Sequence, residues 1–279
     1  MSAADLKNYT TKTVHRDFIA KLFDTDLRVP LKDVITLPRC NNNFVHFVTF
    51  ALPGDAKTVI PTKPGTSVIP RGTTKAVFRV GNPAAMSNHA VKVENTVATM
   101  HLARQALSSL KIVPKVYAWS ATGEPSDHGW ILEEYMPDIE VESKFHSELT
   151  QDQQHRTLSQ MVAILKEVQD FELPPKASSF GGLGFDADGN VVNGPFVVEP
   201  YDGPYPDMKS MYEGMLEAQL AEADRSRIAE GYRENGLRET LDAFAEQGLE
   251  IILSQNLPET VTPNLIIGDV VVLVASDVS

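Results

Sequence analysis

The sequence has a single cysteine, no long apolar run and no cluster of basic residues, and each absence excludes a class of protein. Because Cys40 is alone, no disulfide can form within the chain, and a reducing compartment is the default expectation. No window approaches the ~18 consecutive apolar residues that a membrane span requires. Residues 1–9 also lack the basic and apolar segments of a secretory signal. The sequence therefore predicts a cytoplasmic protein with no membrane partner.

The charge balance excludes another class of partner. The 37 acidic residues outnumber the 25 basic ones, which gives a net charge of -12. Binding to a phosphate backbone requires clustered Lys and Arg, so we expect no nucleic-acid partner. With 279 residues, of which 42% are hydrophobic, the chain is long enough for one large core or for two lobes that share a cleft.

The first half of the sequence is typical of strands with one amphipathic helix. Apolar residues recur at helical spacing between residues 89 and 107, and residues 52–72 are rich in proline and glycine, which favours a long loop. Segments rich in aromatic and β-branched residues predict strands at 44–51, 75–80, 116–119 and 130–135. The helical stripe consists of Val93, Val97, Met100, Ala103 and Leu107.

The second half changes to a helical pattern. One helix is expected at about 150–171, and two or three charged helices are expected between 207 and 255. The apolar face of the first helix consists of Leu158, Met161, Val162, Leu165 and Val168. Residues 181–195 predict a loop and hairpin, and the turn at 188–190 is favoured over a calcium loop because the glycine comes too early. The boundary between the halves lies near Pro137, and the fold class is α+β.

Several segments, in order and spacing, resemble the aminoglycoside-phosphotransferase family of small-molecule kinases. They include Phe-Arg-Val at 78–80, Val-Glu-Asn-Thr-Val-Ala from 93, and Gly-Trp-Ile-Leu-Glu-Glu-Tyr-Met-Pro from 129. The resemblance covers about residues 40–269. It implies a protein kinase-like, two-lobed fold, with a strand-rich N-terminal lobe at 1–137 that ends in a hinge. The helical C-terminal lobe, at 138–279, is expected to be incomplete, because it ends after the expected start of the catalytic loop.

The same resemblance implies where ATP would bind. The carbonyl of Glu134 and the amide of Met136 would hold the adenine, and Arg79 would hold the phosphates. Asn42 and Asn43 belong to the loop that would cover the phosphates. Each assignment has an alternative. Residues 134–136 could be an ordinary strand end, Arg79 could face solvent, and the loop of Asn42 and Asn43 could be a polar hairpin connection.

Two side chains, Thr96 and Glu133, depart from the family pattern. Thr96 occupies the position where the family pattern has a helix glutamate, which pairs with the phosphate-holding cation. Glu94 points about a third of a turn away from the inward direction, so we expect it in solvent. Glu133 stands where relatives have an apolar residue behind the adenine, and a carboxylate is costly in a dry pocket.

The largest departure lies at the end of the sequence. Asp269 follows Ile267 and Gly268 in a stretch that resembles the approach to a kinase catalytic loop, so it is the candidate catalytic residue, with a turn residue between two short strands as the alternative. No asparagine follows it, and Asp277 is two residues from the end, so no metal-binding residue is assigned. The apolar stretch 265–274 is expected to be poorly packed.

Two functions remain open at this point. The first is an ATP-dependent phosphotransferase, inactive or weakly active, whose cofactors when active are ATP and Mg²⁺. Its acceptor would be a small molecule, and the acidic helices suit a cationic one. The alternative is a non-catalytic pseudokinase or binding module for a metabolite or a protein partner.

Overall fold

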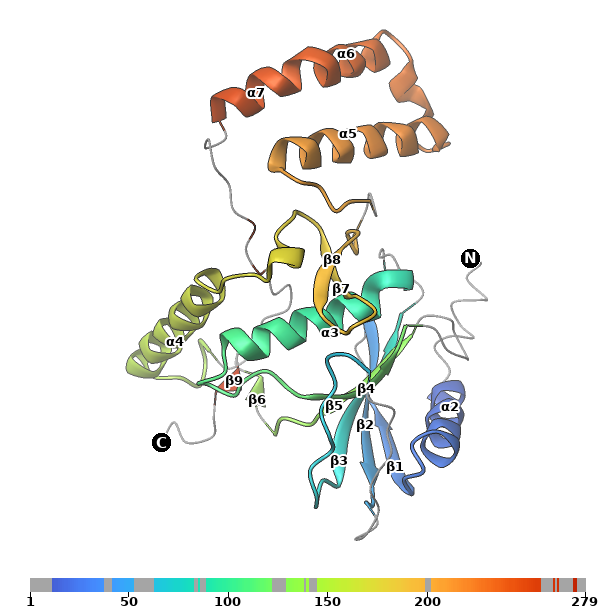
Figure 1. The fold of residues 1–279 in the computed structure, drawn as a ribbon, viewed down its shortest axis with the longest axis vertical. Coiled ribbons are helices and arrows are strands. Elements are labelled where there is room, and N and C mark those ends of the chain that lie inside the picture. Colours follow the sequence, from blue (N-terminus) through green and yellow to red (C-terminus); the bar gives the residue numbers. More distant parts are fainter. Residues whose placement is uncertain are drawn as a thin grey trace.

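The computed structural model describes residues 12–37, 42–52, 63–82, 85, 89–121, 129–137, 139–140, 145–198, 202–256, 263, 265 and 273–274. The fold is α+β. A five-stranded antiparallel sheet occupies the N-terminal half, and the C-terminal half is mostly helical (Figure 1). The predicted class and the division into a strand-rich and a helical half are thereby confirmed.

The sheet has the strand order β1-β2-β3-β5-β4, with every neighbouring pair antiparallel. The strands are β1 (Leu31–Thr36), β2 (Asn43–Phe50), β3 (Lys75–Gly81), β4 (Val116–Ser120) and β5 (Trp130–Glu134). Four of them match the predicted strands within one or two residues. β1 was not predicted, and a register shift between Leu31 and Asp33 interrupts its alternation of apolar and polar residues.

Two helices cover the opposite faces of this sheet. Helix α2 (Lys12–Thr25) places Ile19, Leu22 and Phe23 in a core with Phe50 and Phe78. Helix α3 (His89–Ala106) packs on the other face, where Val93 and Val97 meet residues of β4 and β5. The predicted stripe of α3 is confirmed, since its members are buried apart from the half-buried Met100.

A β-hairpin covers the side of α3 that faces away from the sheet (Figure 1). Strands β7 (Gly182–Phe185) and β8 (Val191–Gly194) form it. In its turn, the Asp186 carboxylate accepts hydrogen bonds from the backbone amides of Asp188 and Asn190, and Gly189 has a φ of 82°. The predicted hairpin turn is confirmed.

Helix α4 (Gln151–Gln169) begins with a capping box formed by Thr150 and Gln153. Much of its apolar face is exposed: Leu158, Val162 and Leu165 are 49%, 65% and 46% exposed. The C-terminal part of the helix reaches a core, where Ile164 and Val168 pack with residues of α3. The helical period was correct, but period alone does not say whether a second surface covers the apolar side.

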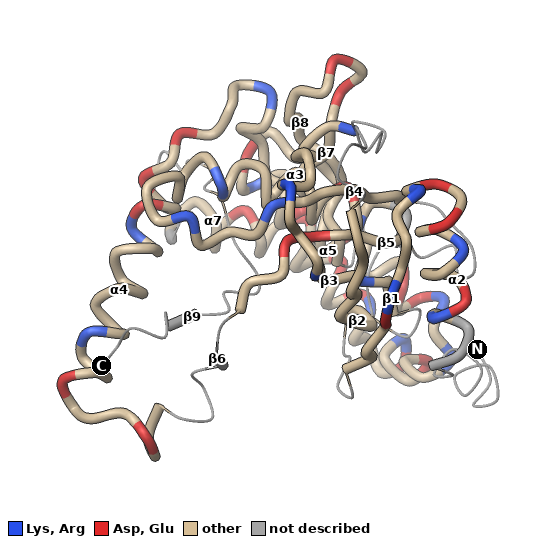
Figure 2. Tube along the Cα trace, turned by 90° about the horizontal axis from the view of Figure 1, so that it is seen from below, with Lys and Arg blue, Asp and Glu red and all other residues tan. Residues whose placement is uncertain are grey.

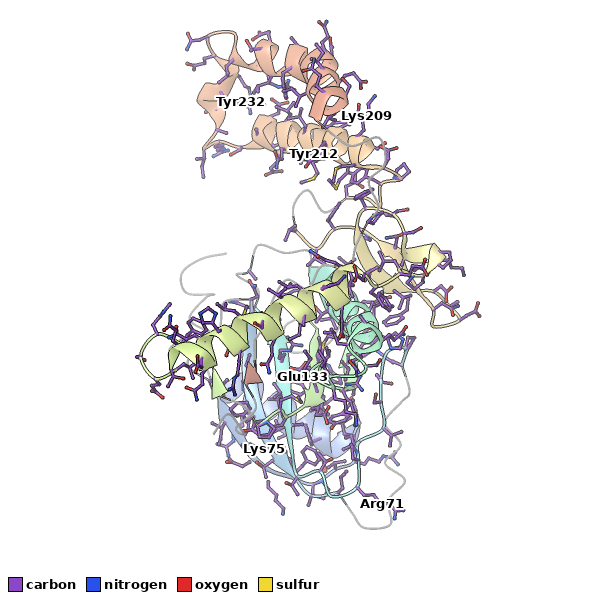
Figure 3. The ribbon with its side chains drawn as sticks, turned by 90° about the vertical axis from the view of Figure 1, so that its left-hand side faces the viewer. Arg71, Lys75, Glu133, Lys209, Tyr212 and Tyr232 are labelled. Carbon is purple, nitrogen blue, oxygen red and sulfur yellow. The ribbon has the colours of Figure 1, made fainter. Side chains whose placement is uncertain are left out.

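The charged helices form a unit that stands away from the sheet in Figures 1 and 3. They are α5 (Met208–Arg225), α6 (Leu237–Ala243) and α7 (Leu249–Asn256), with a π-helical segment, Phe244–Gly248, between the last two. Asp207 caps α5 by accepting a hydrogen bond from the amide of Ser210. An ion pair between Lys209 and Glu250 joins α5 to α7.

The described part of the C-terminal segment is packed rather than loose. Leu265 is 5% exposed and belongs to a core with Leu102, Val168 and Val191. Strand β9 (Leu273–Val274) pairs with β6 (Ile139–Glu140). The expectation of poor packing is therefore wrong at these positions. Of the helices that the structure describes, none combines the length and apolarity that crossing a bilayer requires.

Candidate functional site

The centre of the candidate site is an ion pair between adjacent strands of the sheet. Because Arg79 lies opposite Ile131 and Val77 lies opposite Glu133, the odd-numbered side chains of β3 and β5 share one face. On that face, Nη2 of Arg79 donates a hydrogen bond of 2.5 Å to Oε2 of Glu133. Figure 3 shows Glu133 on the sheet, below α4.

Burial and charge act on Glu133 in opposite directions. Desolvation raises the pKa of its carboxyl, and the charge and hydrogen bond of Arg79 oppose that rise. The side chain of Glu133 is 9% exposed and that of Arg79 is 24% exposed. The pair explains how a carboxylate is tolerated at a position where an apolar residue was expected.

Arg79 is directed toward α3 rather than into solvent. Its Nη2 lies 3.5 Å from the sulfur of Met100, and its buried Nε has no hydrogen-bond partner among the described residues. Thr96, the position where a helix carboxylate was expected, donates instead to the carbonyl of Lys92. The carboxylate that contacts Arg79 therefore comes from β5 and not from α3.

Glu94 has a different role from the predicted one. It is half-buried, and its Oε1 accepts a hydrogen bond of 2.8 Å from the amide of Phe185 in β7. The neighbouring Asn95 donates to the carbonyl of Leu183 in the same strand, at 3.4 Å. The expectation that Glu94 lies in solvent is wrong, because the hairpin covers the side of α3 that sequence alone leaves open.

Asn42 and Asn43 lie where β2 begins. The carbonyl of Asn42 accepts hydrogen bonds from the Nζ of Lys92, at 2.5 Å, and from the amide of Asn82, at 3.1 Å. Asn43 pairs with Gly81, two positions beyond the pair of Val45 with Arg79, so it shares the face of Arg79. Lys92 is 8% exposed. It joins the start of α3 to this end of the sheet, a contact that the sequence did not indicate.

Glu134 and Met136 lie at the other end of β5. The amide of Glu134 donates to the carbonyl of Lys115, whereas the amide of Met136 makes no hydrogen bond within the described part of the chain. Both residues line a cavity of about 430 Å³, together with Arg104, Lys111, Lys115, Leu107, Ser108 and Val113. Arg79 and Asn43 do not line it, so the structure does not gather the predicted ATP-binding residues into one cavity.

An aromatic cluster lies on the Arg79 face, near the end of β5. The rings of Phe47 and Tyr135 meet edge to face, with centroids 5.3 Å apart. The Nζ of Lys75 lies 4.0 Å from the Tyr135 centroid and 5.2 Å from that of Phe47. Sequence reasoning missed this cluster, although the alternation of β2, β3 and β5 places these three residues on the face of Glu133.

Asp269, the candidate catalytic residue, lies outside the described residues, as does Asp277. Across the part of the chain that the structure describes, no group of three His, Cys, Asp or Glu side chains could hold a metal ion. Asp186, an alternative considered for calcium, is held by amides of its own turn and by an ion pair with Lys176 at 2.8 Å.

Comparison with known proteins adds no family assignment. No family model matches the chain, and a search of curated proteins found no significant match.

Proposed function

We propose that this chain is a kinase-like protein of the aminoglycoside-phosphotransferase type that keeps a nucleotide-binding cleft and has weak or no transferase activity. The order of elements supports the proposal: two strands separated by a long loop, then a helix, two more strands and a connecting segment. Helix α3 packs on the face of the sheet that carries Arg79. This is the arrangement that the resemblance implies for a phosphate-holding cation.

The observation that carries the proposal is the Arg79–Glu133 ion pair. A cation on the central strand, fixed by a carboxylate, is what positions phosphates in such proteins. Here the carboxylate belongs to the residue just before the hinge. A nucleotide phosphate would have to compete with Glu133 for Arg79. This competition would weaken nucleotide binding and would give the low activity that we propose.

The residues present fit the two cofactors unequally. Among the described residues, the backbone amide of Met136 has no partner, so it could donate to an adenine nitrogen, and Arg79 could hold phosphate oxygens. For Mg²⁺, by contrast, the described residues offer no set of carboxylates. We therefore assign no catalytic step that depends on the metal.

The second candidate function is a non-catalytic binding module. It is favoured by the same ion pair, because a neutralised Arg79 leaves the cleft without a free cation at that point. The acidic helices α5, α6 and α7 would then offer a surface for a cationic metabolite or a basic partner.

The test is thermal unfolding of the full chain with ATP, with and without Mg²⁺. A ligand that binds only the native state stabilises it and raises Tm. At a ligand concentration of one hundred times Kd, the free energy of unfolding increases by about 2.7 kcal/mol. We expect a small Tm increase with ATP, a larger one in Glu133→Gln and none in Arg79→Met. Arg71→Met changes an exposed loop arginine and serves as the control.

Two results would overturn the proposal in different ways. The absence of any Tm increase at millimolar ATP in both the native chain and Glu133→Gln would exclude the nucleotide cleft and leave the binding module. Rapid Mg²⁺-dependent turnover that Asp269→Asn abolishes would exclude the inactive assignment.

A further inference from the structure

The exposed edge of the sheet at β1 has backbone groups that could pair with another strand. The amide of Leu37 donates to the carbonyl of Val45, so these two residues form a hydrogen-bonded pair. Along β1, hydrogen-bonded and non-hydrogen-bonded residues alternate from that pair. It follows that Val34 and Thr36 direct their N–H and C=O groups away from β2. Among the described residues, no strand pairs with this side of β1.

A groove runs beside this edge. A cavity of about 660 Å³ lies between α2 and β1, within the ~300–1,000 Å³ range of ligand pockets. Arg16, Ala20 and Asp24 line its helix side at intervals of four residues, which places them on one stripe of α2. The strand side consists of residues 28–34. Figure 1 shows α2 beside β1 at this end of the sheet.

The charges that line the groove are not used within the described part of the fold. The lining includes three basic side chains, Arg16, Arg28 and Lys32, and two acidic ones, Asp24 and Asp33. None of the five makes a hydrogen bond or ion pair through its side chain there. The groove is thus net positive in a chain whose net charge is -12. Figure 2 shows positions of both signs along α2 and the neighbouring strand.

A solvated, protected edge is the simplest alternative. Charged side chains and a bulge, such as those at Lys32 and Asp33, discourage strands from pairing at an edge. Such a defence, however, requires neither a cavity between helix and strand nor an excess of basic side chains in its lining. Because basic side chains outnumber acidic ones in the lining, its net charge favours an acidic strand over a basic one.

We propose that the groove between α2 and β1 binds an extended acidic segment of a partner protein, which adds to the sheet as a strand beside β1. Main-chain hydrogen bonds to Val34 and Thr36 supply affinity, and Arg16, Arg28 and Lys32 select acidic side chains. A strand beside six residues spans roughly 20 Å, so a segment of about six residues is sufficient. Neither Arg79 nor Glu133 lines this groove.

The experiment uses the full chain and a fluorescein-labelled peptide, Glu-Thr-Val-Glu-Val-Thr-Glu-Val, followed by fluorescence anisotropy. A second peptide has Lys in place of each Glu, and a third has the first sequence with N-methyl groups on alternate residues. We expect the first peptide to bind, and the other two to bind at least about 10-fold more weakly, because one loses charge complementarity and the other loses main-chain donors.

Two protein variants test the location. The combined change Arg16→Glu and Arg28→Glu is expected to weaken binding of the first peptide at least about 10-fold. The single change Arg28→Glu is expected to weaken binding less than the combined change does. Lys21→Glu alters α2 outside the groove lining and should leave binding unchanged. Thermal unfolding of each variant shows whether the fold is intact.

Three results would overturn the proposal. The first is no binding of the acidic peptide up to about 1 mM. The second is equal binding of the N-methylated or lysine peptide. The third is a dimer in sedimentation velocity that the Arg16 and Arg28 changes dissociate, because the groove would then be occupied by a second copy of this chain.

Discussion

The imidazole of His46 lies edge to face with that of His15, with ring centroids 5.3 Å apart, in the core between α2 and the sheet. Both residues are buried, at 0% and 3% exposure. Nδ1 of His46 is 3.0 Å from the hydroxyl of Thr36, and its buried Nε2 has no hydrogen-bond partner in the part of the chain that the structure describes. Burial, assisted by the neighbouring His15, lowers the pKa of His46 to about 4. Burial also lowers the pKa of His15.

Stability should therefore fall as the pH is lowered. In the unfolded chain these histidines take up protons near pH 6.5, whereas in the folded chain they stay neutral until lower pH. The unfolded state binds more protons in this window, so the free energy of unfolding decreases from pH 6.5 to about 4, by at most about 1.4 kcal/mol per pH unit for His46.

Urea unfolding at several pH values would measure this dependence. The variant His46→Gln should show a smaller slope between pH 6.5 and 4.5, and His155→Gln, an exposed position on α4, should keep the native slope. An unchanged slope in His46→Gln would show that His46 does not titrate between the two states.

The ion pair of Arg79 and Glu133 predicts a coupling energy. Glu133→Leu leaves a mostly buried guanidinium without its counter-charge, so we expect a loss of about 3 kcal/mol in the free energy of unfolding. The double variant with Arg79→Met should be more stable than the sum of the single changes implies, by about 1–3 kcal/mol. Denaturant titration of the four proteins gives the cycle.

An exposed ion pair provides the comparison for this cycle. Lys166 and Asp170 on α4 have side chains that are 72% and 62% exposed, and we expect no measurable coupling between them. Additive effects of the Arg79 and Glu133 changes would mean that the pair does not act as a unit.

The contact between Glu94 and Phe185 predicts that one side chain holds the β7–β8 hairpin on α3. Glu94→Ala leaves the amide of Phe185 without its acceptor, and a hydrogen bond to a charged group contributes about 1.5–3 kcal/mol. Hydrogen exchange should quicken at Phe185. Glu167→Ala, at an exposed site on α4, should leave that exchange unchanged; equal protection in both variants would contradict the assignment.

The packing of Leu265 predicts that the C-terminal segment contributes to stability. Leu265→Ala removes buried atoms from the core near Val168, which should cost about 2–4 kcal/mol. Leu158→Ala, at a half-exposed position on α4, should cost much less. If both substitutions have the same small effect on denaturant unfolding, the segment is not stably packed.

The sequence predicted the elements that carry a strong period. Helices α3 and α4 and four strands appeared close to their expected bounds, because each contains an uninterrupted apolar pattern. Helix α2 and strand β1 were missed: α2 has only Phe18, Ile19, Leu22 and Phe23 as its large inward residues, and β1 contains a register shift.

The candidate site was predicted less completely, for a physical reason. Arg79 could be identified from its strand, but its partner could not, because strand register decides whether Glu133 lies beside it. Likewise, Glu94 was expected in solvent since helical geometry gives its direction but not what lies there. Pairings between distant segments, such as β7 with α3, are not encoded in a local period.

The bonds from Glu94 and Asn95 to the β7 strand have a mechanical consequence for α3. The helix packs against the sheet on one side and is hydrogen-bonded to the hairpin on another, so moving α3 alone away from the sheet would break these bonds. Any rearrangement that carries α3 away from Arg79 must also displace the hairpin, which makes helix and hairpin a single moving part.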